Sequence, residues 1–229
     1  LGAVSVICSD KTGTMTQNKM TVVRAYQNGR IYNKDGFSKE DLFLLAKGMS
    51  LCSDAKVDGG IYGDPTEVAL VEFANSFGMH KGALEKETPR IDELPFDSVR
   101  KMMSTAHKDG DRTIVYTKGA LDQILKETTK IEIDGNVRDI TQENRQNIVD
   151  AAKSMSDDAL RVLALAYSRD YSEKIEEKNL TFIGLVGMVD PPREAAKPAV
   201  ATLKKAGITT IMITGDHKDT AFAIAKELG

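Results

Sequence analysis

The sequence predicts an antiparallel α+β domain inserted into a parallel α/β domain. Two apolar, β-branched runs lie near opposite ends of the chain, Ala3–Ile7 and Thr209–Ile213, and each precedes a polar loop. Helical patterns lie before and after the second run, and this alternation of strands and helices is typical of a parallel sheet. Between them lie three hairpin signals: Asn28-Gly29, Lys108–Asp111 and Asp134–Asn136. We therefore expect the two ends to share one small sheet and the middle to form another.

The terminal segments predict buried strands followed by helices. Both apolar runs are continuous rather than alternating, so we expect each strand to be buried on both faces. One helix is predicted over Arg193–Ala206, with Gly207 as its stop. Pro198 is tolerated only in a first turn, so this helix can begin nearer to that residue. A second helix is predicted over Thr220–Leu228 from its apolar spacing.

N-terminal capping signals predict helices in the middle of the chain. Ser38 and Thr141 each precede a stretch with helical apolar spacing. The stretch GDPTEVALVEFANSFG predicts a third helix, with Asp64 as N-cap, Glu67 as the acid of a capping box and Gly78 as the stop.

The composition predicts a globular chain without a broad basic surface. It has 229 residues, of which 41% are hydrophobic, enough for a core. With 31 Lys and Arg against 34 Asp and Glu, the net charge of −3 provides no overall positive field for nucleic acid or anionic lipid. The longest apolar run, Phe182–Val189, is too short to span a membrane and predicts a buried strand. Cys8 and Cys52 match no metal spacing and are expected to be buried thiols.

A loop suited to phosphate follows the first strand, in ICSDKTGTMTQNKM. Asp10 lies at the carboxyl end of that strand, where parallel sheets bind ligands, and a carboxylate can attack a phosphoryl group to give an aspartyl phosphate. Lys11 adds positive charge, Thr12 offers a hydroxyl and an N–H group, and Gly13 lets the main chain approach phosphate oxygens. Asp-Lys-Thr by itself indicates only an Asx-type turn, whereas the full DKTGT string favours a functional loop.

A second loop of this kind follows the other terminal strand, in ITGDHKDT. Thr214 and the Gly215 amide can hold phosphoryl oxygens beside the N-terminus of the next helix. Alternatively, Asp216 or Asp219 can cap that helix. We expect this loop and Asp10 to converge in space.

The stretch ICSDKTGTMTQNKMTV resembles the phosphorylation motif of the P-type ATPases, ion pumps of the haloacid-dehalogenase-like superfamily, and the likeness extends over the whole chain. Within the family the sequence is most similar to type II calcium-transporting pumps. The resemblance implies that ATP phosphorylates Asp10, within the motif that also contains Lys11, and that Asp10 and the main-chain carbonyl of Thr12 hold magnesium. Thr214–Asp216 resembles the family's second phosphate-site motif, which assigns Asp216 to the phosphorylation site.

For the fold, the resemblance implies an antiparallel-sheet nucleotide-binding domain, residues 19–189, inserted into an incomplete haloacid-dehalogenase-like (Rossmann-like) phosphorylation domain, residues 1–18 and 190–229. MVDPPREAAK resembles the hinge by which the inserted domain returns, stiffened by two prolines. Arg193 is implied to tie hinge and nucleotide together. From the sequence alone it is equally a solvated residue of a first helical turn.

The resemblance also implies an ATP pocket in the inserted domain. Glu67 corresponds to an adenine-contacting glutamate, and Phe96 to a phenylalanine that stacks on adenine, with Lys101 beside the ring. Many calcium pumps carry an arginine two positions after that phenylalanine. Here Ser98 stands there, so a triphosphate contact is either missing or supplied by Arg100. Taken without the family, Phe96 is an ordinary core aromatic.

Two further segments complete the implied pocket. In VYTKGALDQIL, Gly119 permits close backbone approach and Lys118 is a cation at the floor of the adenosine pocket. In DALRVLALAYS, Arg161 is implied to clamp the nucleotide phosphates while Leu163 lines the pocket. Without the resemblance, Lys118 is a solvated lysine at a strand end and Arg161 a charge that faces outward.

Thr12 separates the candidate functions. Soluble phosphatases of the superfamily place a general acid–base aspartate two residues after the nucleophile, where this chain has Thr12. Water should therefore attack the acyl phosphate more slowly, which favours a pump. A soluble phosphotransferase or phosphatase, and a module that only binds nucleotide, stay as alternatives.

We expect the chain to be a cytosolic fragment of an ATP-driven cation pump, with calcium as the ion that the resemblance implies. It begins with Leu1 rather than methionine, and the family's GDGxND motif and phosphate-binding lysine do not occur before Gly229, so we expect the fragment alone to be inactive. The expected cofactors are ATP and Mg²⁺. The expected partners are the actuator and transmembrane domains of the same parent, which lies in the cell membrane with this fragment on the cytoplasmic side. We expect no nucleic acid and no direct membrane contact by the fragment.

Overall fold

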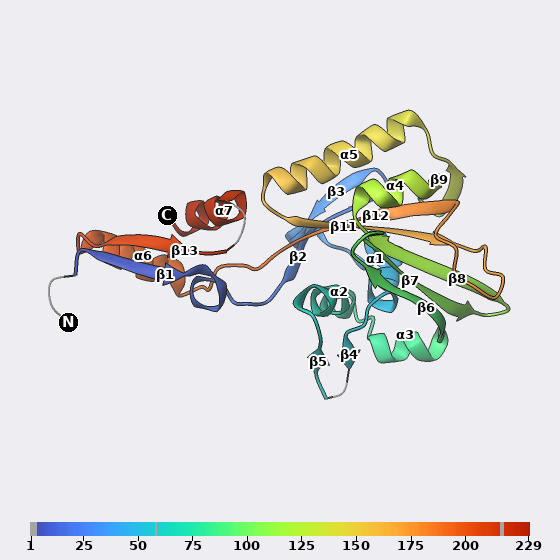
Figure 1. Ribbon diagram of the computed structural model, residues 1–229, viewed down its shortest axis with the longest axis horizontal. Coiled ribbons are helices and arrows are strands. Elements are labelled where there is room, and N and C mark those ends of the chain that lie inside the picture. The colour runs from blue at the N-terminus through green and yellow to red at the C-terminus, as the bar shows by residue number, and fades with distance from the viewer. Residues whose placement is uncertain (1–3, 58, 216–217) are drawn as a thin grey trace.

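The computed structural model describes residues 4–57, 59–215 and 218–229, which form a large body and a narrow extension that holds both chain ends (Figure 1). The helices are α1 (Lys39–Leu51), α2 (Pro65–Asn75), α3 (Lys81–Glu87), α4 (Leu121–Glu127), α5 (Gln142–Asp157), α6 (Ala196–Lys205) and α7 (Lys218–Leu228). The strands are β1 (Val6–Asp10), β2 (Thr21–Gln27), β3 (Arg30–Asn33), β4 (Lys56–Val57), β5 (Ile61–Tyr62), β6 (Arg90–Asp97), β7 (Met102–Asp109), β8 (Arg112–Gly119), β9 (Thr128–Ile133), β10 (Asn136–Asp139), β11 (Arg161–Ser168), β12 (Leu180–Val189) and β13 (Thr209–Ile213).

The extension is built on the parallel pair β1 and β13, in which Asp10 lies opposite Ile213. This pairing confirms the predicted parallel sheet formed by the two ends. The prediction that both strands are buried on both faces is wrong, because exposed and half-buried side chains alternate along each strand. Within the described residues only α6 and α7 accompany the two strands, so one face has little to cover it. Cys8, predicted to be buried, is exposed for this reason.

The body is built on a large, mostly antiparallel sheet. Its main strand order is β10-β9-β12-β11-β8-β7-β6, and β2 joins β12 to β3. The long strand β12 pairs with β11 along one edge. Its other edge is divided, since β9 pairs in parallel with Leu180–Phe182 and β2 pairs antiparallel with Gly184–Val189. As predicted, β12 is buried along nearly its whole length.

The three predicted hairpins are confirmed. They join β2 to β3, β7 to β8 and β9 to β10. In the first turn Asn28 and Gly29 have φ of 54° and 73°, and in the third Asp134 and Gly135 have φ of 49° and 76°. Positive φ at both central positions is the requirement of the turns that match strand twist, which is why Asn-Gly and Asp-Gly predicted them.

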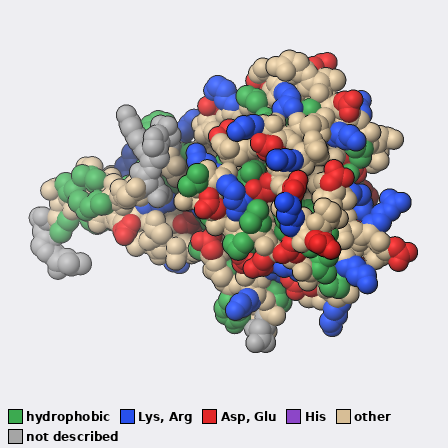
Figure 2. Space-filling view, turned by 45° about the vertical axis from the view of Figure 1, so that its right-hand side comes forward, with side chains coloured by type: hydrophobic (Ala, Val, Ile, Leu, Met, Phe, Trp, Pro, Cys, Tyr) green, Lys and Arg blue, Asp and Glu red, His purple; other side chains and the backbone are tan. Residues whose placement is uncertain are grey.

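Helices cover both faces of the large sheet: α4 and α5 lie above it in Figure 1, and α1, α2 and α3 lie below. Each layer encloses its own apolar core. Cys52 belongs to the core between α1 and the sheet, and its burial raises the pKa of the thiol, as expected for a buried cysteine. In Figure 2 basic and acidic side chains are interspersed over the visible face of the body.

The predicted helix starts at Ser38 and Thr141 are confirmed. Ser38 Oγ accepts a hydrogen bond from the Asp41 N–H group at 3.1 Å, and Thr141 forms a reciprocal capping box with Asn144. In the extension, α6 begins at Ala196 rather than Arg193, so Pro198 lies in its first turn, where its missing donor is harmless. No helix in the described part of the chain combines the length and apolar character needed to cross a membrane.

Candidate functional site

A cavity of about 640 Å³ opens on the body where α2, the ends of β6 and β8, and the start of β11 meet. This volume lies within the range of ligand pockets. The cavity brings together seven side chains or backbone positions that the sequence predicted for nucleotide binding. These are Glu67, Phe96, Lys101, Lys118, Gly119, Arg161 and Leu163. Asp54, Asp64 and Thr66 complete the polar lining; of these, sequence reasoning had assigned only a helix cap, to Asp64.

A buried ion pair forms part of the lining. Lys118 Nζ lies 2.5 Å from both carboxylate oxygens of Glu67, and the Asp54 N–H group donates to Glu67 Oε2 at 3.0 Å. The Lys118 side chain is only 5% exposed, so it is not the solvated lysine of the alternative interpretation. The capping-box role predicted for Glu67 is wrong. Asp64 alone caps α2, accepting from the Thr66 N–H group, while the Glu67 carboxylate points across to β8.

Two cations fix the loop that carries Asp54. Lys81 Nζ donates to the carbonyls of Ser53 and Ala55 at 2.6 and 2.7 Å, and Arg90 Nη2 donates to the Ser53 carbonyl at 2.6 Å. Burial lowers the pKa of Lys81. The sequence held no signal for these contacts, because their partners are backbone carbonyls distant along the chain.

Phe96 stands at the edge of the cavity with 63% of its surface exposed. A core aromatic would be buried, so that interpretation is excluded. The chain turns directly after the ring. The Asp97 carboxylate accepts from the N–H groups of Arg100 and Val99, both at 2.9 Å, and the bond from Arg100 is the main cause that lowers the pKa of Asp97. Lys101 closes the turn with a φ of 54°.

Gly119 is required by the chain's own packing. A Cβ atom at this position would lie 2.3 Å from the Lys101 carbonyl oxygen, which accepts a hydrogen bond from the Ala120 N–H group at 3.0 Å. The sequence predicted that Gly119 lets a nucleotide approach the backbone closely. In the structure the turn that follows Phe96 approaches Gly119 in this way. Any side chain at position 119 would push that turn away from β8.

Arg161 connects this cavity with a second one. Its guanidinium donates to Thr66 Oγ1 at 2.7 Å, and the residue is exposed at the start of β11. It also lines a cavity of about 450 Å³ between body and extension, to which Lys11 and Asp190 contribute. Arg161 therefore lies on the border of a pocket in the body and of a space that reaches the residue after Asp10.

The other two arginines predicted to bind nucleotide lie outside the first cavity. Arg100 Nη1 contacts both carboxylate oxygens of Glu177 at 2.5 and 2.6 Å, so the supply of a triphosphate contact by Arg100 has no support in the geometry. Arg193 lies between body and extension, where it donates to the carbonyls of Gly13 and Thr16 at 2.7 and 3.0 Å.

Two chain segments cross side by side between body and extension. Asp190 accepts from the Thr16 hydroxyl at 2.5 Å and from the Lys19 N–H group at 3.0 Å. The Gln17 N–H group donates to the Pro191 carbonyl at 3.0 Å. Together with Arg193 these bonds form a double crossing, defined here as the hinge (residues 16–19 and 190–193). Sequence reasoning identified the prolines and Arg193 but missed Asp190.

The Asp10 loop follows β1 at the edge where β13 also ends. Asp10 Oδ1 accepts from the Thr12 N–H group at 3.2 Å, an Asx-type turn, and Gly13 has a φ of 75°. Because Asp10 pairs with Ile213, Thr214 and Gly215 follow at the same edge as the carboxylate. The prediction for Asp216 lies outside the described residues.

The predicted magnesium donors are oxygen atoms, the carboxylate of Asp10 and the main-chain carbonyl of Thr12. Magnesium is usually held by one or two carboxylates together with substrate phosphates and water, so this donor set fits a partial coordination shell. The residues that the structure describes contain no group of three His, Cys, Asp or Glu side chains placed to hold a metal by themselves.

Comparison with known proteins identifies the family. The model of the P-type ATPase cytoplasmic domain N matches residues 42–195, more than half of the chain. The chain therefore belongs to the P-type ATPases. All residues that line the cavity beside Phe96 lie inside the matched range, whereas Asp10 and Thr214 lie outside it.

Relatives match the chain over its whole length. It is 49% identical to calcium-transporting ATPase 1 of Bacillus cereus, 44% identical to calcium-transporting ATPase 1 of Lactococcus lactis, and 36% identical to the human calcium-transporting ATPase type 2C member 1. It spans 27% of the length of each of these proteins.

Proposed function

We propose that this chain is the ATP-binding and phosphoryl-accepting part of a cation-transporting P-type ATPase. Residues 19–189 are then the nucleotide-binding domain, inserted between residues 1–18 and 190–229 of a haloacid-dehalogenase-like phosphorylation domain. The observation that carries the proposal is that Arg161 borders both the cavity beside Phe96 and the space that reaches Lys11, next to Asp10. The names of the relatives favour calcium as the transported ion.

ATP enters the cavity with its base against the exposed ring of Phe96, since aromatic faces stack readily on bases. The Glu67 carboxylate accepts from the adenine amino group, and Lys118 holds that carboxylate in place. The triphosphate runs toward Arg161, whose planar guanidinium suits phosphate oxygens. Lys101 adds a second positive charge at the rim.

The transfer step takes place at Asp10. One carboxylate oxygen attacks the γ-phosphorus, the bond from this phosphorus to the bridging oxygen breaks, and ADP leaves with the electron pair. Lys11 and the N–H groups of the loop at Thr214 and Gly215 stabilise the charge on the transferred group. Mg²⁺ bound by Asp10 and the Thr12 carbonyl would supply further charge neutralisation. Bending at the hinge would change the distance between the two sites, because the cavity lies in the body and Asp10 in the extension.

The rest of the pump is supplied by domains of the same parent protein. We place that parent in the cell membrane, with an actuator domain and transmembrane helices as partners and with this chain on the cytoplasmic side. Thr12 leaves no general acid or base two residues after Asp10, so the aspartyl phosphate persists long enough to drive a conformational cycle.

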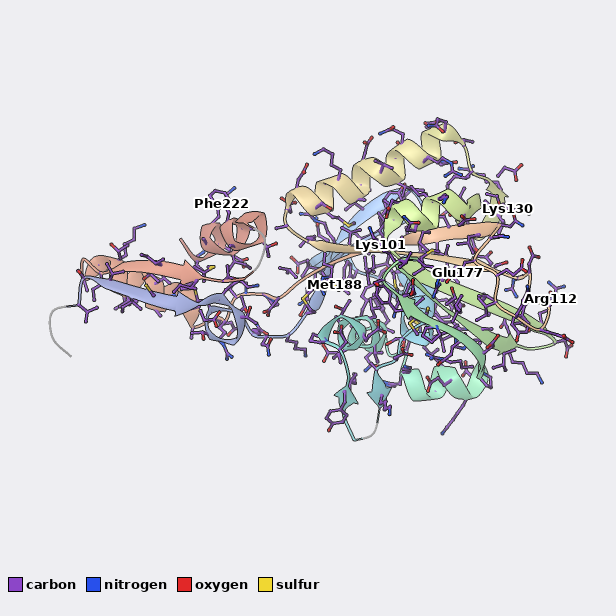
Figure 3. The ribbon with its side chains drawn as sticks, in the orientation of Figure 1. Lys101, Arg112, Lys130, Glu177, Met188 and Phe222 are labelled. Atoms are coloured by element: carbon purple, nitrogen blue, oxygen red, sulfur yellow. The ribbon has the colours of Figure 1, made fainter. Side chains whose placement is uncertain are left out.

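Calorimetric titration of the 229-residue chain with ATP tests the pocket. Because stacking on an aromatic contributes about 1–3 kcal/mol per base, Phe96→Ala should weaken ATP binding about tenfold or more. Phe222→Ala is the matched control, since this ring is 68% exposed on α7 in the extension (Figure 3). Equal affinities for the two variants, or no binding by the unaltered chain, would contradict the proposal.

Phosphorylation is tested in the longer pump. Radiolabelled ATP should give an acid-stable, hydroxylamine-sensitive label that Asp10→Asn abolishes. A label that persists in Asp10→Asn, on a different residue, would instead support a soluble phosphotransferase.

A further inference from the structure

Glu177 does not line the cavity beside Phe96, yet both oxygens of its carboxylate form polar contacts. The residue lies in the connection between β11 and β12, and its side chain is 9% exposed (Figure 3). Its two oxygens contact Arg100 Nη1 at 2.5 and 2.6 Å, and Oε1 also accepts from the Ser104 hydroxyl at 2.7 Å. A nearly buried carboxylate needs such partners, and here the main partner, Arg100, belongs to the turn that directly follows Phe96.

Arg100, which is held by Glu177, also forms hydrogen bonds with the residues on both sides of Phe96. Its Nη2 donates to the Pro95 carbonyl at 2.6 Å, directly before the ring, while its own N–H group donates to the Asp97 carboxylate directly after it. The Lys101 N–H group donates to the Asp97 carbonyl at 2.6 Å and completes the turn. Both sides of Phe96 are thus tied to Arg100, to Pro95 through its guanidinium group and to Asp97 through its backbone N–H group, and the guanidinium group is tied to Glu177.

Because Phe96 is exposed, the contacts of Arg100 matter for the position of its ring. With 63% of its surface exposed, the ring has few packing contacts of its own, so the backbone of residues 95–101 sets where it lies. The same turn carries Lys101, the cation at the rim of the cavity.

We propose that Glu177 is a positioning residue for nucleotide, which acts through Arg100 to hold Phe96 and Lys101 against the cavity. The inference rests on the proposed function. It also assigns Arg100 a supporting role in place of a phosphate contact. A metal site at Glu177, with the nearby Glu127 and Glu176, is not supported, because the described residues form no group of three metal-ligating side chains.

Four variants of the chain test this proposal by their dissociation constants for ATP. Glu177→Gln should weaken binding about tenfold, because a neutral amide holds the guanidinium less firmly. Arg100→Gln should weaken it to a similar extent, and the double variant should bind no worse than either single one. Asp109→Asn is the matched control. It removes the ion pair with Arg169, which lies in the same β11–β12 connection, and should leave the affinity unchanged.

The double variant of Glu177 and Arg100 tests whether Glu177 acts through Arg100 or has a separate structural role. Losses that add in the double variant would show that Glu177 does not act through Arg100, and an unaltered affinity in Glu177→Gln would equally overturn the proposal. Glu177→Asp keeps the carboxylate at shorter reach, and an intermediate affinity in this variant supports the proposal if Glu177→Gln does not fold.

NMR spectra of the chain without nucleotide test the role of Glu177 separately from ATP binding. Without nucleotide, Glu177→Gln should shift the backbone amide resonances of Phe96 and Lys101, whereas Asp109→Asn should not. If the unaltered chain binds no ATP but these shifts occur, the proposed function fails while the anchorage stands. If ATP binds and Glu177→Gln moves neither the shifts nor the affinity, only the inference fails.

Discussion

At the scale of single residues, the ion pair of Lys118 and Glu67 requires two charged groups to lose hydration. Both groups are largely withdrawn from water, at 5% and 19% side-chain exposure, and each gives up favourable hydration. Their bidentate contact and the N–H group of Asp54 offset that loss. The pair's net contribution to stability is therefore small, but the loss of one partner leaves the other charge uncompensated.

Lys118→Met should consequently lower the free energy of unfolding by about 3 kcal/mol, as expected when a buried pair loses one member. Lys153→Met is the matched control, because Lys153 and Asp157 form a pair at 69% and 63% exposure and should contribute less than about 1 kcal/mol. Urea unfolding without nucleotide measures both values. A similar small change in the two variants would show that the Lys118 pair is solvated.

His107 predicts how stability depends on pH. Burial lowers its pKa from 6.5 to about 4 in the folded chain. Between these values the unfolded chain binds the proton and the folded chain does not, so stability is fully present above pH 6.5 and is lost as the pH falls toward 4. The loss should approach about 3 kcal/mol. His107→Gln should flatten the profile in this range, while His80→Gln, at an exposed position, should not; identical slopes would contradict the assignment.

Sequence reasoning predicted which residue types form the site better than it predicted their partners. Glu67 satisfied the spacing of a capping box, and nothing local revealed that Lys118, 51 positions away, takes its carboxylate. Arg100 had the charge to contact phosphate, but Glu177 neutralises it from a segment 77 positions away. Phe96 and Arg161 reach the cavity as the family resemblance implied, because their placement depends on the whole fold that the resemblance supplied.

At the scale of helices and strands, the elements fixed by local chemistry were predicted well. The caps at Ser38 and Thr141 and the hairpins at Asn28-Gly29 and Asp134-Gly135 depend on contacts a few residues apart. The divided edge of β12, with β9 parallel and β2 antiparallel, depends on contacts across the chain and left no local pattern. The burial of β1 was misjudged because periodicity does not reveal which elements are present to cover a strand.

Gly119→Ala tests an element contact that shapes the site. The added methyl group would meet the Lys101 carbonyl oxygen at 2.3 Å, so β8 and the turn after Phe96 must separate. We expect a loss of about 1–3 kcal/mol in unfolding free energy, together with weaker ATP binding. Gly36→Ala is the control, as nothing lies within 4 Å of its added methyl group. Equal stability of the two variants would contradict the close approach.

For the whole molecule, the hinge connects the part that contains the cavity beside Phe96 with the part that contains Asp10. Body and extension are connected by two chain segments, and Asp190 binds the first of these from the second. These hydrogen bonds hold the two connecting segments side by side. This arrangement suits a transfer reaction whose donor and acceptor sites lie in separate parts of the chain.

Asp190→Asn should loosen this connection, because an amide cannot serve the Thr16 hydroxyl and the Lys19 N–H group as well as a carboxylate does. Spin labels on exposed Cys8 and on a cysteine introduced by Glu143→Cys report the distance between extension and body, since Cys52 is buried. The distance distribution should broaden in Asp190→Asn. Asp158→Asn, which breaks a pair with Arg24 inside the body, should leave it unaltered; broadening in both or neither would contradict the role of the hinge.

The central claim is that the cavity between Phe96 and Lys118 is the ATP site, and a nitrogen-15 NMR titration of the chain with ATP tests it most directly. We predict saturable amide shifts at Phe96, Lys101, Gly119 and Arg161, and their loss in Phe96→Ala. Saturable shifts confined to other parts of the body, with these four amides unmoved, would contradict the claim.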